Sequence, residues 1–164
     1  MRIAVVDSSP LIYLTHLGLA GELSSFFDVV YVPRVVHTEV NRKGRFRYQL
    51  KKLYQTGCFL RCMAADRTNV RLLMDQMHEG EAEALVQAEE QAAGFFIGDE
   101  KRAREIGRLK GFKVVGTVRL LARLHLEGRA SEPWALVRKL RRERSFRVSE
   151  AVVNEAIAMA SQPI

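Results

Sequence analysis

The sequence contains few of the residues that crosslink small extracellular proteins or bind zinc. Only two of its 164 residues are cysteines, and four are histidines. Cys58 and Cys62 flank a short apolar segment that we expect to be a strand, and residues four apart on a strand lie beyond disulfide reach. The histidines occur singly, without a second zinc ligand at a suitable spacing. The composition therefore predicts two reduced thiols and argues against a structural zinc site.

Long apolar runs are also missing. No uncharged stretch approaches the roughly 18 residues of a membrane span, and the apolar residues before Asp7 are too few for the core of a signal peptide. We therefore expect a cytoplasmic protein with no membrane partner. The four prolines and 11 glycines are spread singly, and no sequence repeat is visible. The length suits one domain, so we expect a single domain over residues 1–164.

Positive charge is the most distinctive feature of the composition. Lysine and arginine number 26 against 19 aspartate and glutamate residues, which gives a formal net charge of +7. This balance suits a polyanionic partner such as nucleic acid, although many basic proteins bind none and charge alone identifies no partner. The apolar fraction of 48% excludes collagen-like and wholly disordered chains.

Short apolar runs alternate with segments of helical periodicity along most of the chain. This alternation is typical of α/β proteins, in which parallel strands are joined by helices. We expect strands at residues 3–6, 29–32, 59–63, 95–97 and 113–115. Helices are expected from residue 11 and at residues 34–41, 46–55, 70–77, 80–93, 101–109, 117–127, 134–144 and 150–160. Residues 146–148 have the composition of an added edge strand.

Two acidic residues follow predicted strands. Asp7 comes directly after residues 3–6, and Asp99 follows residues 95–97 with only Gly98 between. The carboxyl ends of parallel strands meet at one edge of a sheet, where ligands bind in open α/β folds, so we expect both carboxylates at that edge. Each acid also stands where a helix is expected to begin. The alternative interpretation is that both acids only cap helices.

Three glutamates occur on helix faces that are otherwise apolar. Glu39 lies on the same face as Val35 of its predicted helix. In residues 80–84, Glu81 and Glu83 align with alanine, leucine and valine side chains. A buried carboxylate is costly unless it is paired, protonated or bound to a cation. We interpret these glutamates as candidate functional residues, while a capping role for Glu81 at the helix start stays open.

Acidic side chains from four separate segments are thus expected to converge in an otherwise basic protein. Several carboxylates in one crevice repel one another, and protonation or a hard divalent cation relieves that repulsion. Oxygen ligands suit Mg²⁺ or Mn²⁺ rather than zinc. Such an ion activates water for attack on a phosphodiester. The pattern therefore predicts metal-dependent hydrolysis of nucleic acid.

Four segments, taken in order, resemble the acidic motifs of PIN-domain nucleases. Their sequences are VDSSPLI at residues 6–12, VVHTEV at 35–40, GEAEA at 80–84 and IGDEKRA at 97–103. Together with GFKVVGT at 111–117, they look like a subgroup of small prokaryotic PIN proteins. The resemblance covers residues 2–125. Residues 130–164 match less distinctly, and we expect them to form a helical extension packed on the same domain.

The resemblance implies a three-layer α/β/α sandwich with a central parallel sheet. It also implies an Mg²⁺- or Mn²⁺-dependent ribonuclease, related to the toxins of VapBC-type systems and acting on single-stranded or structured RNA. By the same analogy we expect a homodimer and a cognate antitoxin that covers the acidic site.

Carried over by position, the family's catalytic and metal-binding acids are Asp7, Glu39, Glu83 and Asp99. Glu81 is then an accessory metal ligand, and Ser8 supports the metal or its water. The sequence departs from the commonest pattern in two places: glutamate stands where many members have aspartate in the third motif, and Glu100 replaces a second aspartate. These departures leave open how many ions bind and whether Glu81 or Glu83 is the third ligand.

A basic segment follows Glu39 directly. Residues 42–52 contain six basic residues and no acid, interleaved with Phe46 and Tyr48, a composition suited to phosphate contacts with bases stacking alongside. An ordinary solvated helix has the same composition, so that interpretation stays open. A second basic cluster, at residues 138–147, is expected to be an exposed face. The candidate RNA-binding residues are Arg42, Lys43, Arg45, Arg47, Lys101 and Arg102.

Two other functions compete with the nuclease. The first is a nucleic-acid-binding module that keeps this scaffold without turnover, which would not cleave RNA when a divalent ion is added. The second is a metal-dependent hydrolase of small phosphoesters, which the sequence disfavours because it contains no glycine-rich phosphate-binding loop. An aspartyl-nucleophile phosphatase needs D-x-D-x-T after the first strand, and here Asp7 is followed by Ser-Ser-Pro.

Overall fold

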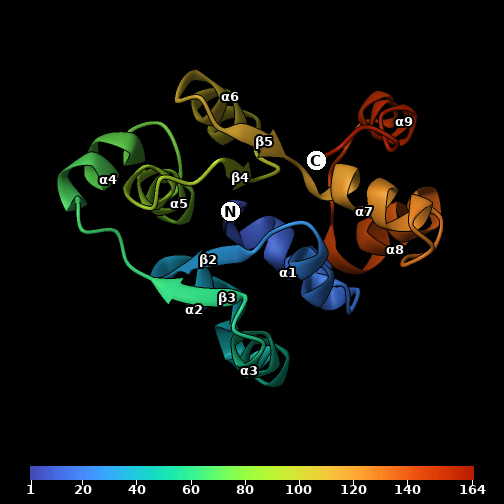
Figure 1. Ribbon diagram of the computed structural model, residues 1–164, viewed down its shortest axis with the longest axis horizontal. Helices are drawn as coiled ribbons and strands as arrows, with labels where there is room; N and C mark the ends of the chain where they lie inside the picture. Colours follow the sequence, from blue (N-terminus) through green and yellow to red (C-terminus); the bar gives the residue numbers. More distant parts are fainter. The chain divides into compact units, whose positions relative to one another are not determined.

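Five strands of the described chain form one sheet, in the order β3-β2-β1-β4-β5 (Figure 1). The computed structural model describes the whole chain apart from the side chain of Lys43. Strand β1 pairs in parallel with both β2 and β4, and β2 pairs in parallel with β3. The predicted α/β class with a central parallel sheet is therefore confirmed. The strands are β1 (Ile3–Val6), β2 (Val29–Pro33), β3 (Phe59–Cys62), β4 (Phe95–Ile97) and β5 (Lys113–Val115).

Helices and short 3₁₀ turns connect the strands, and three more helices follow the last strand. None of the helices that the structure describes is long and apolar enough to cross a membrane. The helices are α1 (Ser8–His16), α2 (Arg34–Val40), α3 (Arg47–Gln55), α4 (Arg67–Met74), α5 (Glu79–Glu90), α6 (Lys101–Leu109), α7 (Thr117–Leu126), α8 (Pro133–Arg144) and α9 (Glu150–Ala158), and the turns are η1 (Ala20–Ser25) and η2 (Arg42–Gly44).

Two helices begin one turn earlier than the periodicity predicts, because an aspartate caps each. Helix α1 begins at Ser8, since the carboxylate of Asp7 accepts a hydrogen bond from the backbone N–H of Ser8. Helix α4 begins at Arg67, since Asp66 accepts one from the backbone N–H of Asn69. A capping side chain satisfies a backbone donor that the helix itself leaves unpaired, so it extends the helix beyond its apolar stripe.

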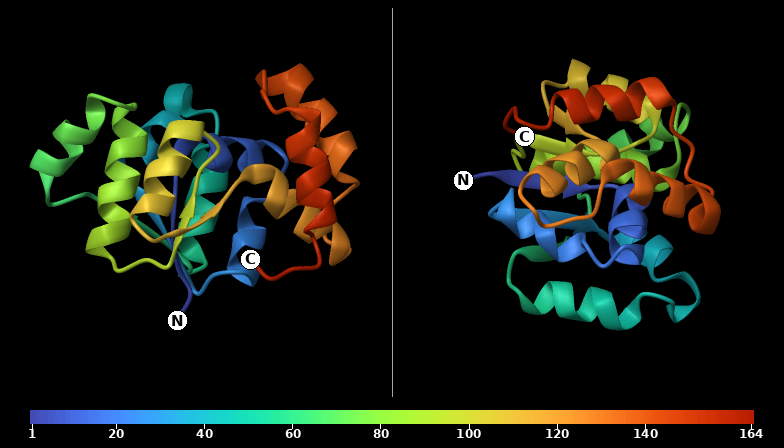
Figure 2. Two further views of the ribbon diagram at one scale, coloured as in Figure 1. Left: turned by 90° about the horizontal axis from the view of Figure 1, so that it is seen from above. Right: turned by 90° about the vertical axis from the view of Figure 1, so that its right-hand side faces the viewer.

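The chain divides into two compact units, residues 1–114 and residues 115–164. In the first unit, α5 packs against β1, β2 and β4. The strands lie between α5 on one side and α1 on the other, which gives the three layers of the predicted sandwich (Figures 1 and 2). That the whole chain forms one domain, with residues 130–164 packed on the rest, stays a prediction.

Helix α5 is the central helix of the first unit. Residues 80–88 are all buried, so this helix has no exposed face along its first two turns. Alanines at positions 84 and 88 keep it slim enough to pack closely on the strands, and Leu85 joins Val5 and Phe96 in the apolar core. Glu81 and Glu83 are carried into the protein interior with it. Their burial therefore follows from where the helix packs.

In the second unit, α7 packs against both α8 and α9. Arg119 and Arg123 of α7 donate hydrogen bonds to backbone carbonyls of residues 160–162, just beyond α9. The edge strand predicted at residues 146–148 is wrong: this segment has no regular structure. Ser145 ends α8 in a left-handed backbone conformation (φ 52°), which turns the chain towards the start of α9. The three residues link two helices.

Candidate functional site

The ends of β1 and β4 place two acidic residues at the carboxyl edge of the sheet. Val6 is paired with Ile97, and the backbone N–H of Asp7 continues this pairing by donating to the carbonyl of Ile97 at 2.9 Å. Asp99 follows two residues beyond Ile97. Gly98 is required between them, since a Cβ at this position would lie 2.5 Å from the ring of Phe96. Both aspartates therefore lie at the edge where the sequence predicts them.

Asp7 is the most deeply buried of these acids, with 1% of its surface exposed. Its Oδ1 atom accepts hydrogen bonds from the backbone N–H of Ser8 at 2.7 Å and from Ser8 Oγ at 3.4 Å. Burial, together with the charges of Glu81, Glu39 and Asp99, raises the pKa of Asp7 from 3.8 to about 7, against the effect of the Ser8 hydrogen bond. Three carboxylates from other elements thus act on Asp7, and we call Asp7, Glu39, Glu81 and Asp99 the acidic group.

Glu39 comes from α2 and packs directly against the start of α5. A Cβ added to Gly80 would lie 2.9 Å from Oε2 of Glu39 and 3.2 Å from its Oε1. Glycine at position 80 therefore lets this half-buried carboxylate rest against the backbone of the first turn of α5. The N-terminus of a helix carries partial positive charge, which favours an anion at this position.

Glu81 both caps α5 and belongs to the acidic group. Its Oε2 atom accepts a hydrogen bond from the backbone N–H of His78 at 3.0 Å, as half of a capping box. Burial raises the pKa of Glu81, and the charges of Glu100 and Glu39 raise it further, while the His78 hydrogen bond lowers it. The capping interpretation of Glu81 is confirmed, and its charge also acts on Asp7.

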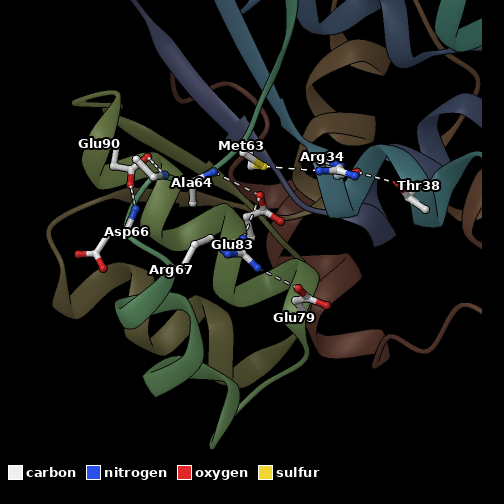
Figure 3. Close-up of polar contacts among 10 residues, drawn as sticks. Arg34, Thr38, Met63, Ala64, Asp66, Arg67, Glu79, Glu83 and Glu90 are labelled. Atoms are coloured by element: carbon white, nitrogen blue, oxygen red, sulfur yellow. Dashed lines mark hydrogen bonds and ion pairs between the residues drawn. The ribbon is translucent and has the colours of Figure 1, made fainter.

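Glu83 is directed to a different place, the loop between β3 and α4 (Figure 3). Its Oε1 atom accepts a hydrogen bond from the backbone N–H of Ala64 at 3.2 Å and lies 3.5 Å from the guanidinium of Arg67. Its Oε2 atom is buried without a hydrogen-bond partner among the described residues. Glu83 is fully buried, yet it is not among the charges that raise the pKa of Asp7. The structure therefore groups Asp7 with Glu81, and Glu83 with Arg67.

The same loop is held by two further glutamates (Figure 3). Glu90 accepts hydrogen bonds from the backbone N–H groups of Ala65 and Asp66, at 3.1 and 2.7 Å. Glu79 pairs with Arg67 at 3.1 Å. Carboxylates at three positions of α5 thus fix residues 64–67 against this helix. Glu83 is thus one of the three residues whose carboxylates contact this loop and the start of α4.

The helix that follows Asp99 is capped by the next residue in the chain. Helix α6 begins at Lys101, and Glu100 accepts a hydrogen bond from the backbone N–H of Ala103 at 3.0 Å. The N-cap residue of this helix is therefore Glu100, one residue after Asp99. Asp99 is half-buried.

The predicted RNA-binding residues are mostly exposed. Arg42, Arg45 and Arg47 are exposed around the start of α3, and Lys101 is exposed at the start of α6. Arg102 is engaged within the protein, since it bonds to Gln76 and lies 3.6 Å from Glu105. The side chain of Lys43 lies outside the described part of the chain. The structure therefore leaves the first three arginines as the better candidates for phosphate contacts.

The cysteines show the state that their spacing predicts. Both are free. Burial raises the pKa of the Cys62 thiol to about 12, with the charges of Glu83 and Glu90 acting in the same direction. Burial also raises the pKa of Cys58. Both thiols are protonated at neutral pH, so neither offers a thiolate for metal binding or nucleophilic attack.

The donor chemistry of the acidic group fits a hard divalent cation. Its ligands are carboxylate oxygens, and the charges of Glu81, Glu39 and Asp99 add to the effect of burial in raising the pKa of Asp7. As the side chains stand, no three histidine, cysteine, aspartate or glutamate residues of the described chain are gathered closely enough to hold an ion. The chemistry therefore fits, while the carboxylates are spaced more widely than ligands of a bound ion.

Two residues that matter in this region, Arg67 and Gly80, were not among the candidates predicted from the sequence. Arg67 carried no signal, because an exposed arginine at the start of a helix resembles any solvated residue. Gly80, in contrast, has a sequence signal from which a close contact could have been predicted. Glycine disfavours a helix by about 0.5–1 kcal/mol relative to alanine, so its position in the first turn of α5 indicates that a neighbouring group comes close. That group is the carboxylate of Glu39.

Comparison with known protein families gives one match. The family model described as "DUF3368: PIN domain" matches residues 3–162. No curated protein and no solved structure matches the chain at a significant level.

The environment of Asp7 predicts how stability depends on pH. Its pKa is about 7 in the folded state against 3.8 in an unfolded reference, so the folded state binds the extra proton between these values. Stability contributed by this group is therefore lost as the pH rises through that window. We expect Asp7→Asn to raise the melting temperature of metal-free protein more at about pH 8 than at about pH 5. Thermal unfolding in a chelator measures this. Asp75→Asn, at an exposed position, is the control, and an equal effect of Asp7→Asn at both pH values would contradict the burial of the charge.

The contacts of Glu83 predict a structural role. Glu83→Gln keeps an acceptor for Ala64 but removes the charge that faces Arg67, so we expect a loss of about 1–3 kcal/mol in the free energy of unfolding. Glu79→Gln removes the more exposed partner of the same arginine and should cost less than about 1 kcal/mol. Urea titration measures both variants. Equal, small losses would show that the buried pair contributes little.

Proposed function

The chain belongs to the PIN-domain family over residues 3–162, and from this premise we propose that it is an Mg²⁺- or Mn²⁺-dependent ribonuclease that hydrolyses phosphodiester bonds. One observation carries the proposal. Asp7 is buried beside three other acids in a protein whose net charge is +7. Natural proteins rarely keep buried like charges together unless a cation or a proton serves the site.

We assign the ion to Asp7, Glu39, Glu81 and Asp99. Glu81 takes the place that the family resemblance offered to Glu83, because its charge acts on Asp7 whereas Glu83 is engaged by Ala64 and Arg67. The carboxylates must move closer together on binding. Glu39 and Asp99 are half-buried, and rotation of their side chains supplies this movement.

Each residue then has a definite task. Ser8 orients the carboxylate of Asp7 through its backbone N–H and its hydroxyl. The N-terminus of α5 stabilises the charge of Glu39, and exposed arginines near α3 hold the phosphates of the substrate. When bound, a divalent ion supplies Lewis-acid stabilisation of the negative charge that develops on the scissile phosphate. The homodimer and the cognate antitoxin stay predictions of the family resemblance.

One observation favours the alternative, a nucleic-acid-binding module without turnover. No three candidate ligands of the described chain are close enough to hold an ion as they stand. A binder of this kind loses affinity as salt is added but needs no divalent ion. Cleavage therefore separates the two functions.

The nuclease function predicts cleavage that depends on a divalent ion and on the acids. Purified protein with a mixed RNA pool should yield fragments in Mn²⁺ and none in excess chelator. Asp7→Asn and Asp99→Asn should each lower the cleavage rate by at least about 100-fold, since each removes a charged ligand. Asp75→Asn is the exposed control and should cleave like the wild type. RNA that is bound but never cut by the wild type would establish the binding module instead.

The assigned ligands predict which substitutions weaken ion binding. Mn²⁺ should raise the melting temperature of the wild type and of Glu83→Gln, and should raise that of Glu81→Gln less. Gly80→Ala should also reduce the Mn²⁺ shift, since its methyl group would displace the carboxylate of Glu39. Gly94→Ala, where a Cβ meets open space, is the matched control. A normal shift in Glu81→Gln with a lost shift in Glu83→Gln would reverse the assignment.

A further inference from the structure

Tyr48 is exposed far beyond what is usual for an aromatic side chain. Among the described residues it is the one aromatic side chain that is largely exposed, with 66% of its surface accessible. Helix α3 does not need it for packing: Leu50 and Leu53 are buried beneath the helix, and the Tyr54 hydroxyl lies 2.8 Å from Nδ1 of His37. An exposed aromatic that contributes little to the core is typical of a binding surface.

A cation already lies against this ring. The ammonium of Lys52, one helix turn further along α3, is 4.5 Å from the ring centroid of Tyr48. An ammonium covers only one face of a planar ring, and with 66% of its surface accessible the ring of Tyr48 leaves room for a second planar group. The pair therefore offers a flat stacking surface next to a fixed positive charge. This is the combination that proteins use to bind an unpaired base together with its phosphate.

The surroundings of Tyr48 are positively charged. Between Glu39 and Asp66 the chain contains seven lysine and arginine residues and no acid. Arg45 and Arg47 are exposed directly before Tyr48, and Lys51 and Lys52 are exposed one turn later. This helix therefore attracts a polyanion rather than an apolar partner.

The topology brings this surface towards the acidic group. Helix α3 packs on β3 and is joined to it by a short turn, so it runs antiparallel to that strand (Figure 2). Strand β3 is parallel to β2, which is parallel to β1. The N-terminus of α3, with Arg47 and Tyr48, therefore lies at the edge of the sheet where β1 ends in Asp7.

We propose that the exposed face of α3 selects single-stranded RNA by stacking an unpaired base on Tyr48, with Lys52, Arg45 and Arg47 holding the adjacent phosphates. This inference rests on the proposed function and specifies its substrate class. The bases of a duplex are stacked on each other and present no free face, so a duplex meets only the basic residues. Tyr48 thus favours unpaired over paired RNA.

Binding measured without cleavage tests the inference. Fluorescence anisotropy in excess chelator compares a labelled single-stranded RNA with a blunt-ended RNA duplex of the same length. Tyr48→Ala should weaken single-strand binding about tenfold and leave duplex binding nearly unchanged. Tyr48→Phe keeps the ring and should bind like the wild type. Gln49→Ala, a neighbouring exposed position on the same helix, is the matched control and should also bind like the wild type.

The possible results separate this inference from the nuclease proposal. If Tyr48→Ala matches Gln49→Ala on the single strand, or weakens both RNAs equally, the stacking role is wrong, and Mn²⁺-dependent cleavage by the wild type would still support the nuclease. If Tyr48→Phe loses as much affinity as Tyr48→Ala, the hydroxyl rather than the ring binds, and stacking is again wrong. Wild-type protein that binds neither RNA in chelator overturns the stacking role, while Mn²⁺-dependent cleavage of the RNA pool decides the nuclease proposal separately.

Discussion

The structure depends on one electrostatic conflict, the burial of the Asp7 carboxylate beside other acids. The backbone N–H of Asp7 is held by Ile97, and its carboxylate accepts hydrogen bonds from Ser8 that would be lost if the side chain turned out to water. Charge in this position opposes folding when no proton or cation is present. A protein that keeps such a group keeps a position at which binding a cation also favours the folded state.

Helix α5 determines which acids join this group. Because it is buried along its first two turns, its glutamates have to be satisfied inside the protein. Glu81, in the first turn, is directed to the carboxyl edge of the sheet, where its charge acts on Asp7. Glu83, two residues later, is directed across the helix to Ala64 and Arg67. Residues two apart on a helix face different directions, so one segment supplies both a candidate ligand and a structural ion pair.

Much of the fold and part of the site could be predicted from the sequence. Short apolar runs locate all five strands, because buried parallel strands are continuous apolar segments. The positions of Asp7 and Asp99 followed from the rule that parallel strands end at one edge. The choice between Glu81 and Glu83 could not be made, since both lie in a helix that is buried all round and periodicity then distinguishes no face. The partner of Glu83, Arg67, lies 16 residues away in the sequence and has no local signature.

The acidic group and the basic surface have opposite effects on the phosphates of the substrate. Before a cation is bound, a cluster of carboxylates repels the phosphates of its substrate. Seven basic residues without an intervening acid, placed on the segment that follows Glu39, supply the attraction that the cluster cannot. Exposed basic groups act through a screened field, so they bring a polyanion to the surface without fixing its register. A ring such as that of Tyr48 contributes what charge lacks, a contact that only a correctly placed unpaired base can make.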